Sequence, residues 1–158
     1  MKIIKGNLVT LAKEGHFDVI AHGCNCFCRQ KSGLAKQLAD TFMTNKFILE
    51  QPEYCGDFDK LGRINGNTIG LYINNETVIL DVVNCYTQYE YGYDKSIRYV
   101  DYDALTMCMK KINHIFKDKE VGLPWIGCGL ANGDKNIVEQ IYKSTLTDVQ
   151  LTIVEYEN

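Results

Sequence analysis

Apolar residues along the chain gather into short segments that have the patterns of buried or half-buried β-strands. Residues 17–22 and 77–83 are continuous apolar or β-branched runs, which are typical of strands covered on both faces. Residues 2–5 and 120–124 are shorter segments of this kind, and residues 149–154 alternate between polar and apolar side chains. We predict a strand at each position, with residues 149–154 closing the sheet.

A strand pair is predicted between residues 62 and 73. Residues 62–64 and 68–73 have strand character, and Asn65-Gly66-Asn67 between them is a turn signature. Asn74-Asn75 marks the next turn, before the run at residues 77–83. Residues 84–98 contain several tyrosines and are predicted to form a loop.

Three segments have the spacing of amphipathic helices, in which apolar residues recur on one face. They cover residues 34–43, residues 101–116 with an aspartate at the N-cap position, and residues 135–145. The pattern of residues 9–13 fits either a short helix or a loop. Residues 45–60 are poorly patterned and are predicted to be a long connection.

The order of these elements predicts the fold class. Strands mixed with a hairpin come first, and a β-α-β-α-β succession follows, which favours a three-layer α/β/α domain with a mixed central sheet. A chain of 158 residues corresponds to a single domain, residues 1–158, on the usual size relation. In such sheets, ligands bind beyond the carboxyl ends of the strands.

One glycine-rich segment has the features of an anion-binding loop. Gly127, Gly129 and Gly133 separate the strand at 120–124 from the helix at 135–145. Glycines let backbone N–H groups approach a phosphate closely, and the dipole of a helix N-terminus favours negative charge. An ordinary strand-to-helix turn explains the same pattern equally well.

A second segment of similar build precedes the helix at 34–43. The first loop (residues 24–33) follows the strand at 17–22 and ends in Gly33, as the second loop (residues 127–133) follows the strand at 120–124. Both loops therefore lie at carboxyl ends of strands. This coincidence favours a small-molecule ligand that contains phosphate over two unrelated turns.

Composition excludes some classes of protein. Hydrophobic residues make up 46% of the chain and charged residues 23%, as in ordinary soluble domains. The net charge of −3 provides no basic face for a nucleic-acid partner. No apolar run approaches the roughly 18 residues of a membrane span, and no signal peptide is recognisable. We expect a cytoplasmic monomer.

The seven cysteines are predicted to be reduced thiols, because the chain has no export signal and the number is odd. Cys24-Asn25-Cys26-Phe27-Cys28 lacks the C-x₂-C pairs of zinc sites, so we expect no metal. A nucleophilic thiol in the second loop, at Cys128, is possible in principle, but packing of a small side chain is the better interpretation. No cofactor is predicted.

Four motifs together resemble the macro domain family. They are Gly6-Asn7-Leu8, the segment DVIAHGCN at residues 18–25, SGLAK at residues 32–36 and LPWIGCGLANGD at residues 123–134. The resemblance extends over essentially the whole chain. It is strongest for the stand-alone branch described as ADP-ribose-1″-phosphate phosphatases, which includes phage and fungal members.

The resemblance implies ADP-ribose, or its 1″-phosphate, as the ligand, in a cleft across the carboxyl ends of the strands. Asn7 and Leu8 match the position that contacts the adenine end, and Asn25 matches the asparagine that binds the distal ribose. The two phosphate loops then comprise Ser32, Gly33, Leu34 and Ala35 in the first, and Gly127, Cys128, Gly129, Leu130, Ala131, Asn132 and Gly133 in the second.

The sequence departs from the family pattern at three places. Most macro domains have an aspartate at the position of Asn7, and an uncharged amide is a weaker partner for the adenine amino group. The first loop has only Gly33 where a glycine triplet or Gly-Ala-Gly is usual. Lys135 stands where a tryptophan often follows the second loop.

Two residues are candidates for the chemistry of a phosphatase. Asp134 is predicted to orient water or to act as a base, although an aspartate that opens a helix is also a favoured N-cap. His22 is a candidate general acid or base near neutral pH, although a histidine on an apolar strand is often a core residue. Residues 83–86 contain no lysine, which argues against a covalent lysine route known in related de-ADP-ribosylating enzymes.

The leading hypothesis is a phosphatase that converts ADP-ribose 1″-phosphate to ADP-ribose and phosphate. A hydrolase that releases ADP-ribose from modified macromolecules is the alternative enzyme. A non-catalytic ADP-ribose reader is the third hypothesis, and the candidates Asp134 and His22 favour an enzyme over it.

Overall fold

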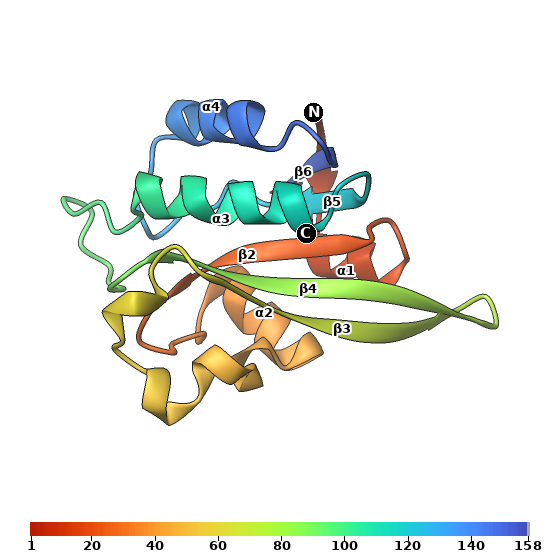
Figure 1. Ribbon diagram of the computed structural model, residues 1–158, viewed down its shortest axis with the longest axis horizontal. Helices are drawn as coiled ribbons and strands as arrows, with labels where there is room; N and C mark the ends of the chain where they lie inside the picture. Colours follow the sequence, from red (N-terminus) through yellow and green to blue (C-terminus); the bar gives the residue numbers. More distant parts are fainter. Residues whose placement is uncertain (158) are drawn as a thin grey trace.

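A mixed β-sheet forms the middle of the protein, for which a computed structural model describes residues 1–157 (Figure 1). Within this range the sheet has six strands in the order β1-β6-β5-β2-β4-β3. Neighbouring strands are parallel except for β3, which runs antiparallel to β4 at one edge. The strands are β1 (Lys2–Gly6), β2 (Val19–Asn25), β3 (Ile64–Ile73), β4 (Glu76–Gln88), β5 (Glu120–Leu123) and β6 (Gln150–Tyr156).

Helices cover both faces of this sheet, so the predicted three-layer α/β/α fold is confirmed. Helices α3 (Tyr102–Ile115) and α4 (Lys135–Thr145) pack on one face, and α1 (Leu8–Lys13) and α2 (Gly33–Phe42) pack on the other (Figure 1). Alternate residues of β2 serve the two layers: Val19 points into the α3/α4 layer and Ile20 into the α1/α2 layer. This double burial explains the continuous apolar runs of the central strands.

The predicted strand pair around Asn65-Gly66-Asn67 is wrong. These residues lie inside the single strand β3, where Asn65 pairs with Asn84 and Asn67 pairs with Val82. The chain turns instead at Asn74-Asn75, whose φ angles of 50° and 66° are typical of a tight hairpin turn. Pairing of the whole length of β3 with β4 outweighs the local turn preference.

Two central strands are longer than the patterns predict. Strand β4 continues to Gln88, through the first third of the predicted tyrosine loop, and β2 continues to Asn25. These extensions carry polar residues to the end of the sheet, where the apolar pattern no longer marks a strand. Strand β6 does not close the sheet, because it lies between β1 and β5.

The two segments without a clear pattern are now defined. Residues 8–13 form helix α1, and residues 44–60 form four successive 3₁₀ turns rather than an open connection. Within residues 1–157, no helix has both the length and the apolar character that a membrane span requires.

Candidate ligand-binding cleft

Two adjoining cavities lie at the carboxyl ends of the parallel strands. The first cavity has a volume of about 380 Å³ and the second about 650 Å³. Both are within the usual range for small-molecule sites. They share the residues Gly33, Leu34, Pro124, Trp125 and Gly129, so they form the two halves of one cleft. Gly33 begins helix α2 and Gly129 belongs to the second loop, so both loops meet at the junction of the cavities.

The first cavity has an uneven distribution of charge. His22 and Asn25 line it from the end of β2, and Arg29 and Lys31 line it from the first loop. No aspartate or glutamate of the described chain contributes to its lining. Two cations without a neighbouring carboxylate favour a negatively charged group at this end of the cleft.

A loop rich in tyrosine forms the outer wall of the first cavity. Tyr91 and Tyr93 line it and remain 42% and 66% exposed. The guanidinium of Arg29 lies 4.9 Å from the centre of the Tyr91 ring, a cation–π arrangement. The side-chain amide of Asn132 donates hydrogen bonds to the carbonyls of Asp94 and Ile97, at 3.0 and 2.7 Å, and so ties this wall to the second loop.

His22 is buried and is held in one tautomer. It lies beside Asn84, its register partner on β4, and its Nε2 is 2.7 Å from Asn84 Oδ1. Because Asn84 Nδ2 donates to the Thr44 carbonyl, Oδ1 must accept, and Nε2 therefore carries the proton. Nδ1 is then an acceptor, and it has no hydrogen-bond partner in the protein.

Burial also decides the charge of this imidazole. Desolvation lowers the pKa of His22 to about 4, and the hydrogen bond with Asn84 opposes the shift only in part. The ring is therefore neutral at pH 7. A neutral imidazole whose buried Nδ1 has no partner in the protein can accept a hydrogen bond from a group that reaches it, but it cannot act as a strong acid at this pH.

The second loop is compact because its two ends are bonded to each other. The Gly133 N–H donates to the Gly127 carbonyl at 2.7 Å, and Gly127 has a φ of 80°, which favours glycine. A Cβ on Gly133 would lie 2.6 Å from the Gly127 oxygen. Burial raises the pKa of the Cys128 thiol to about 11, so this residue is a protonated thiol and a poor nucleophile at neutral pH.

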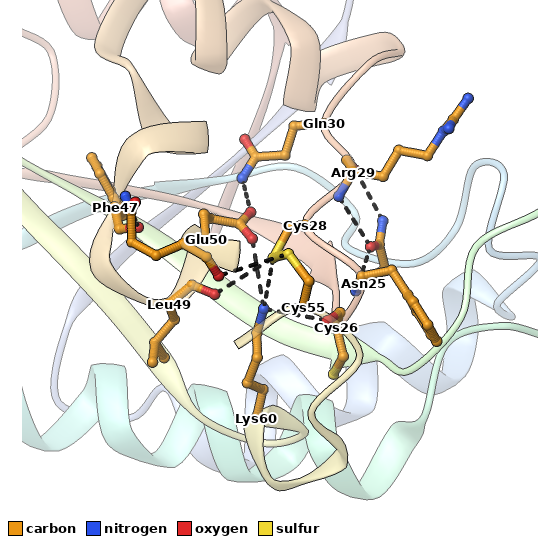
Figure 2. The surroundings of a disulfide bond; sticks show 12 residues. Asn25, Cys26, Cys28, Arg29, Gln30, Phe47, Leu49, Glu50, Cys55 and Lys60 are labelled. Carbon is orange, nitrogen blue, oxygen red and sulfur yellow. Dashed lines mark hydrogen bonds and ion pairs between the residues drawn. A yellow bond between two sulfur atoms is a disulfide. The ribbon is translucent and has the colours of Figure 1, made fainter. Parts of the chain in front are cut away.

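The first loop rests on a buried polar cluster, which Figure 2 shows. Lys60 is fully buried, with Nζ 3.6 Å from Glu50 Oε2 and 3.4 Å from the Cys26 carbonyl. The side-chain amide of Gln30 donates to Glu50 from the other side. Residues far apart in the sequence therefore hold the base of the loop.

Cys28 and Cys55 form a disulfide next to this cluster, with their Cα atoms 5.4 Å apart (Figure 2). The prediction that all seven cysteines are reduced is therefore wrong for this pair. The 3₁₀ turns of residues 44–60 bring Cys55 back to the first loop, which the linear sequence does not indicate. The other five cysteines are free thiols.

Comparison with known proteins places the chain among relatives. No family model matches it. It is 34% identical over 165 residues to an uncharacterised 17.5 kDa protein from the tk-vs intergenic region of Enterobacteria phage T4, covering 99% of this chain and 97% of that protein. This chain belongs to the family of that phage protein.

Solved structures identify the fold. The macrodomain of Thermus aquaticus DarG matches with a TM-score of 0.64 and 17% identity, over 99% of this chain and 97% of that one. A Streptomyces coelicolor macrodomain protein matches with a TM-score of 0.65 and 19% identity, over 99% and 98% of the two chains. A Bacteroides thetaiotaomicron protein matches with a TM-score of 0.71 and 25% identity, over 98% of this chain and 99% of that one. The chain therefore has the macrodomain fold.

Most of the residues predicted to bind ligand line the cleft of this macrodomain. The first cavity contains His22, Asn25, Ser32, Gly33, Leu34, Ala35, Gly127, Gly129, Leu130 and Ala131. Leu8, Cys128 and Gly133 line the second cavity. Asn25 also shapes the first loop, because its Oδ1 accepts from the backbone N–H groups of Phe27 and Arg29.

Three predicted residues line neither cavity. Asn7 caps helix α1, Asn132 holds the tyrosine wall, and Asp134 caps helix α4 by accepting from the Asn136 N–H at 2.8 Å. The backbone N–H of Asp134 donates to the Tyr102 hydroxyl at 2.8 Å. The geometry thus gives Asp134 the structural role that its position before a helix also predicted.

Sequence reasoning missed several residues that line the cleft: Arg29, Lys31, Gln37, Trp125 and Glu155. The two cations were detectable, because they lie inside a segment already predicted to bind phosphate. Trp125 lies between the predicted strand at 120–124 and the second loop at 127–133, and it was assigned no role in binding. Gln37 and Glu155 carry no local signal, since they come together only in the folded protein, where α2 and β6 line the same cavity.

Proposed function

We propose that this macrodomain binds ADP-ribose 1″-phosphate and hydrolyses it to ADP-ribose and phosphate. The cleft has the form that such a ligand requires, with two cavities joined by two glycine-containing loops. The base would occupy the second cavity, the diphosphate the junction, and the distal ribose with its phosphate the first cavity. Solved relatives of the fold support the ligand class, since Thermosipho africanus DarTG is described in complex with ADP-ribose and matches with a TM-score of 0.67 at 13% identity, over 90% of this chain and 38% of that one.

The observation that carries the phosphatase proposal is the charge of the first cavity. Arg29 and Lys31 provide two cations there, and no carboxylate lines it within the described chain. A terminal phosphate adds negative charge where the distal ribose alone has none. In phosphoryl transfer, positioning and charge neutralisation provide most of the catalysis, and these two side chains can provide both.

His22 is proposed to position the attacking water. Its neutral Nδ1 is buried, so it accepts a hydrogen bond from the water only when the side chains that cover it move. This water attacks phosphorus while the bond between phosphorus and the 1″ oxygen breaks. The attacking water keeps one proton, which stays on the phosphate, and its other proton ends on the leaving 1″ oxygen, so the products are ADP-ribose and hydrogen phosphate. The backbone N–H groups of the second loop bind the negative charge during this step.

Phosphate release from ADP-ribose 1″-phosphate tests the proposal. His22→Gln is the sharpest variant, because the glutamine amide can still donate to Asn84 while the acceptor Nδ1 is lost. We expect release to fall by about 100-fold or more, the usual contribution of a positioned acid or base, with ADP-ribose binding retained. Unchanged release in this variant would remove His22 from the mechanism.

Asp134→Ala, measured in the same assay, decides between the two roles predicted for Asp134. Loss of release would place catalysis in the second loop. Retained release, with the free energy of unfolding reduced by about 1 kcal/mol, is the result expected for a helix cap.

Removal of ADP-ribose from modified macromolecules is the second candidate function. The exposed Tyr91 and Tyr93 at the mouth of the first cavity favour it, because a larger substrate could leave the cleft on this side. Release of ADP-ribose from a modified protein, without phosphate release from the small substrate, would favour this function. Binding of ADP-ribose without either reaction would indicate a reader.

A further inference from the structure

The second cavity combines apolar walls with few polar side chains. Leu8, Leu34 and Val154 contribute apolar surface. Gln37 contributes an amide, and Glu155 and Lys135 contribute a carboxylate and an ammonium group that are paired with each other. Apolar walls with a small number of polar groups suit a flat heterocyclic base, whose orientation the polar groups then select. The proposed function places the base of the ligand here.

Asn7 is not available to recognise that base, although its position in the sequence predicts this role. Its Oδ1 accepts from the Thr10 N–H at 3.1 Å and caps helix α1. Its Nδ2 donates to Gln37 Oε1, also at 3.1 Å. Both ends of the Asn7 amide are therefore used within the protein, and its side chain does not line the cavity.

The same hydrogen bond orients Gln37. Because Gln37 Oε1 accepts from Asn7, the amide nitrogen Nε2 is the end that remains for a ligand. Gln37 therefore presents a hydrogen-bond donor to the second cavity. Asn7 acts on the ligand only indirectly, by fixing this orientation.

Glu155 presents an acceptor to the same cavity. Its Oε1 accepts from Lys135 Nζ at 2.6 Å and from Trp125 Nε1 at 2.9 Å. The hydrogen bonds from these two groups lower the pKa of Glu155, so the carboxylate is ionised at neutral pH. Among the described residues, Oε2 has no hydrogen-bond partner, so it remains able to accept from a ligand.

We infer that Glu155 selects an adenine base by accepting from its 6-amino group, while Gln37 Nε2 donates to an adjacent ring nitrogen. A carboxylate only accepts, and adenine offers an N–H donor at position 6 beside an acceptor nitrogen. Hypoxanthine offers the reverse, an oxygen acceptor at position 6 and an N–H at position 1. This assignment rests on the proposed binding of ADP-ribose, and it moves base recognition from Asn7 at the start of the chain to the last strand.

Titration calorimetry with ADP-ribose and with inosine diphosphate ribose, its hypoxanthine analogue, tests the inference. We expect the wild-type protein to bind ADP-ribose at least about tenfold more tightly, because the carboxylate faces an unpaired oxygen in the analogue. In Glu155→Gln the ratio of the two affinities should fall to within about threefold, since a glutamine amide can both donate and accept.

A matched variant separates base recognition from the ion pair. Lys135→Met removes the partner of Glu155 but leaves the carboxylate, so the preference for adenine should persist even if overall affinity changes. An unchanged affinity ratio in Glu155→Gln, or equal binding of both nucleotides by the wild type, would overturn the role of Glu155 in base recognition. Either result would leave the proposed binding of ADP-ribose standing. Binding of neither nucleotide would overturn the proposed function as well.

Discussion

The buried Lys60–Glu50 pair beneath the first loop leads to a quantitative prediction. Both side chains are almost completely inaccessible, at 0% and 1% exposure, and Nζ of Lys60 lies 4.5 Å from the centre of the Tyr86 ring. Lys60→Met preserves the length of the side chain but removes its charge. Glu50 is then a buried carboxylate without a cation, which reduces the free energy of unfolding by about 3–5 kcal/mol.

The loss should depend on pH in a defined direction. Burial raises the pKa of Glu50, and Lys60 counteracts part of this rise. Removal of Lys60 therefore raises the pKa of Glu50 in the folded state further above its unfolded value of about 4.3. A buried carboxyl group with a raised pKa is protonated and neutral in the folded protein at low pH, where it costs little stability. As the pH rises above the pKa of the unfolded state, the folded state must hold a proton or a buried charge, and the free energy of unfolding falls. We expect the variant to lose more stability at pH 8 than at pH 5.

Urea denaturation at both pH values, with the disulfide kept oxidised, measures this difference. The double variant Lys60→Met/Glu50→Gln should recover most of the loss, because its two replaced side chains are neutral and Gln30 can still donate to position 50. A loss below about 1 kcal/mol at pH 8, or the same loss at both pH values, would refute the reasoning, because a buried unpaired carboxylate cannot be that inexpensive.

Two further predictions concern the loops. Reduction of the Cys28–Cys55 disulfide, or Cys55→Ser, should lower the free energy of unfolding by about 3.5 kcal/mol, which is the chain-entropy value for a separation of 27 residues. Denaturation with and without reductant measures this loss. Identical denaturation midpoints would show that the bridge is absent. Gly133→Ala should destabilise the protein by about 2 kcal/mol because its Cβ meets the Gly127 carbonyl, whereas Gly129→Ala meets nothing and should leave the melting temperature unchanged. If the second loop binds the diphosphate, Gly129→Ala should still weaken ADP-ribose binding, and normal binding by this variant would contradict that role.

Local patterns were sufficient for most of the architecture. The apolar run that begins β4 and the helical spacing of α2, α3 and α4 depend on side chains a few residues apart, and burial on one or both faces of an element leaves such a period in the sequence. The two loops were also visible, because a strand end, a glycine and a helix start follow each other directly. These features are enough to predict a mixed α/β/α sheet with a cleft at the carboxyl ends of its strands.

The chemistry of the cleft depends on contacts between residues distant in the sequence. His22 receives its tautomer from Asn84, 62 positions away, and Lys60 reaches the Cys26 carbonyl across 34 positions. A local sequence pattern cannot reveal such pairs, because it contains only the residues that are neighbours along the chain and not the distant residue that each of them contacts. For this reason the family resemblance marked Asn7 as a ligand contact and Asp134 as a catalytic residue, whereas the fold brings Gln37 of α2 and Glu155 of β6 to the cavity instead.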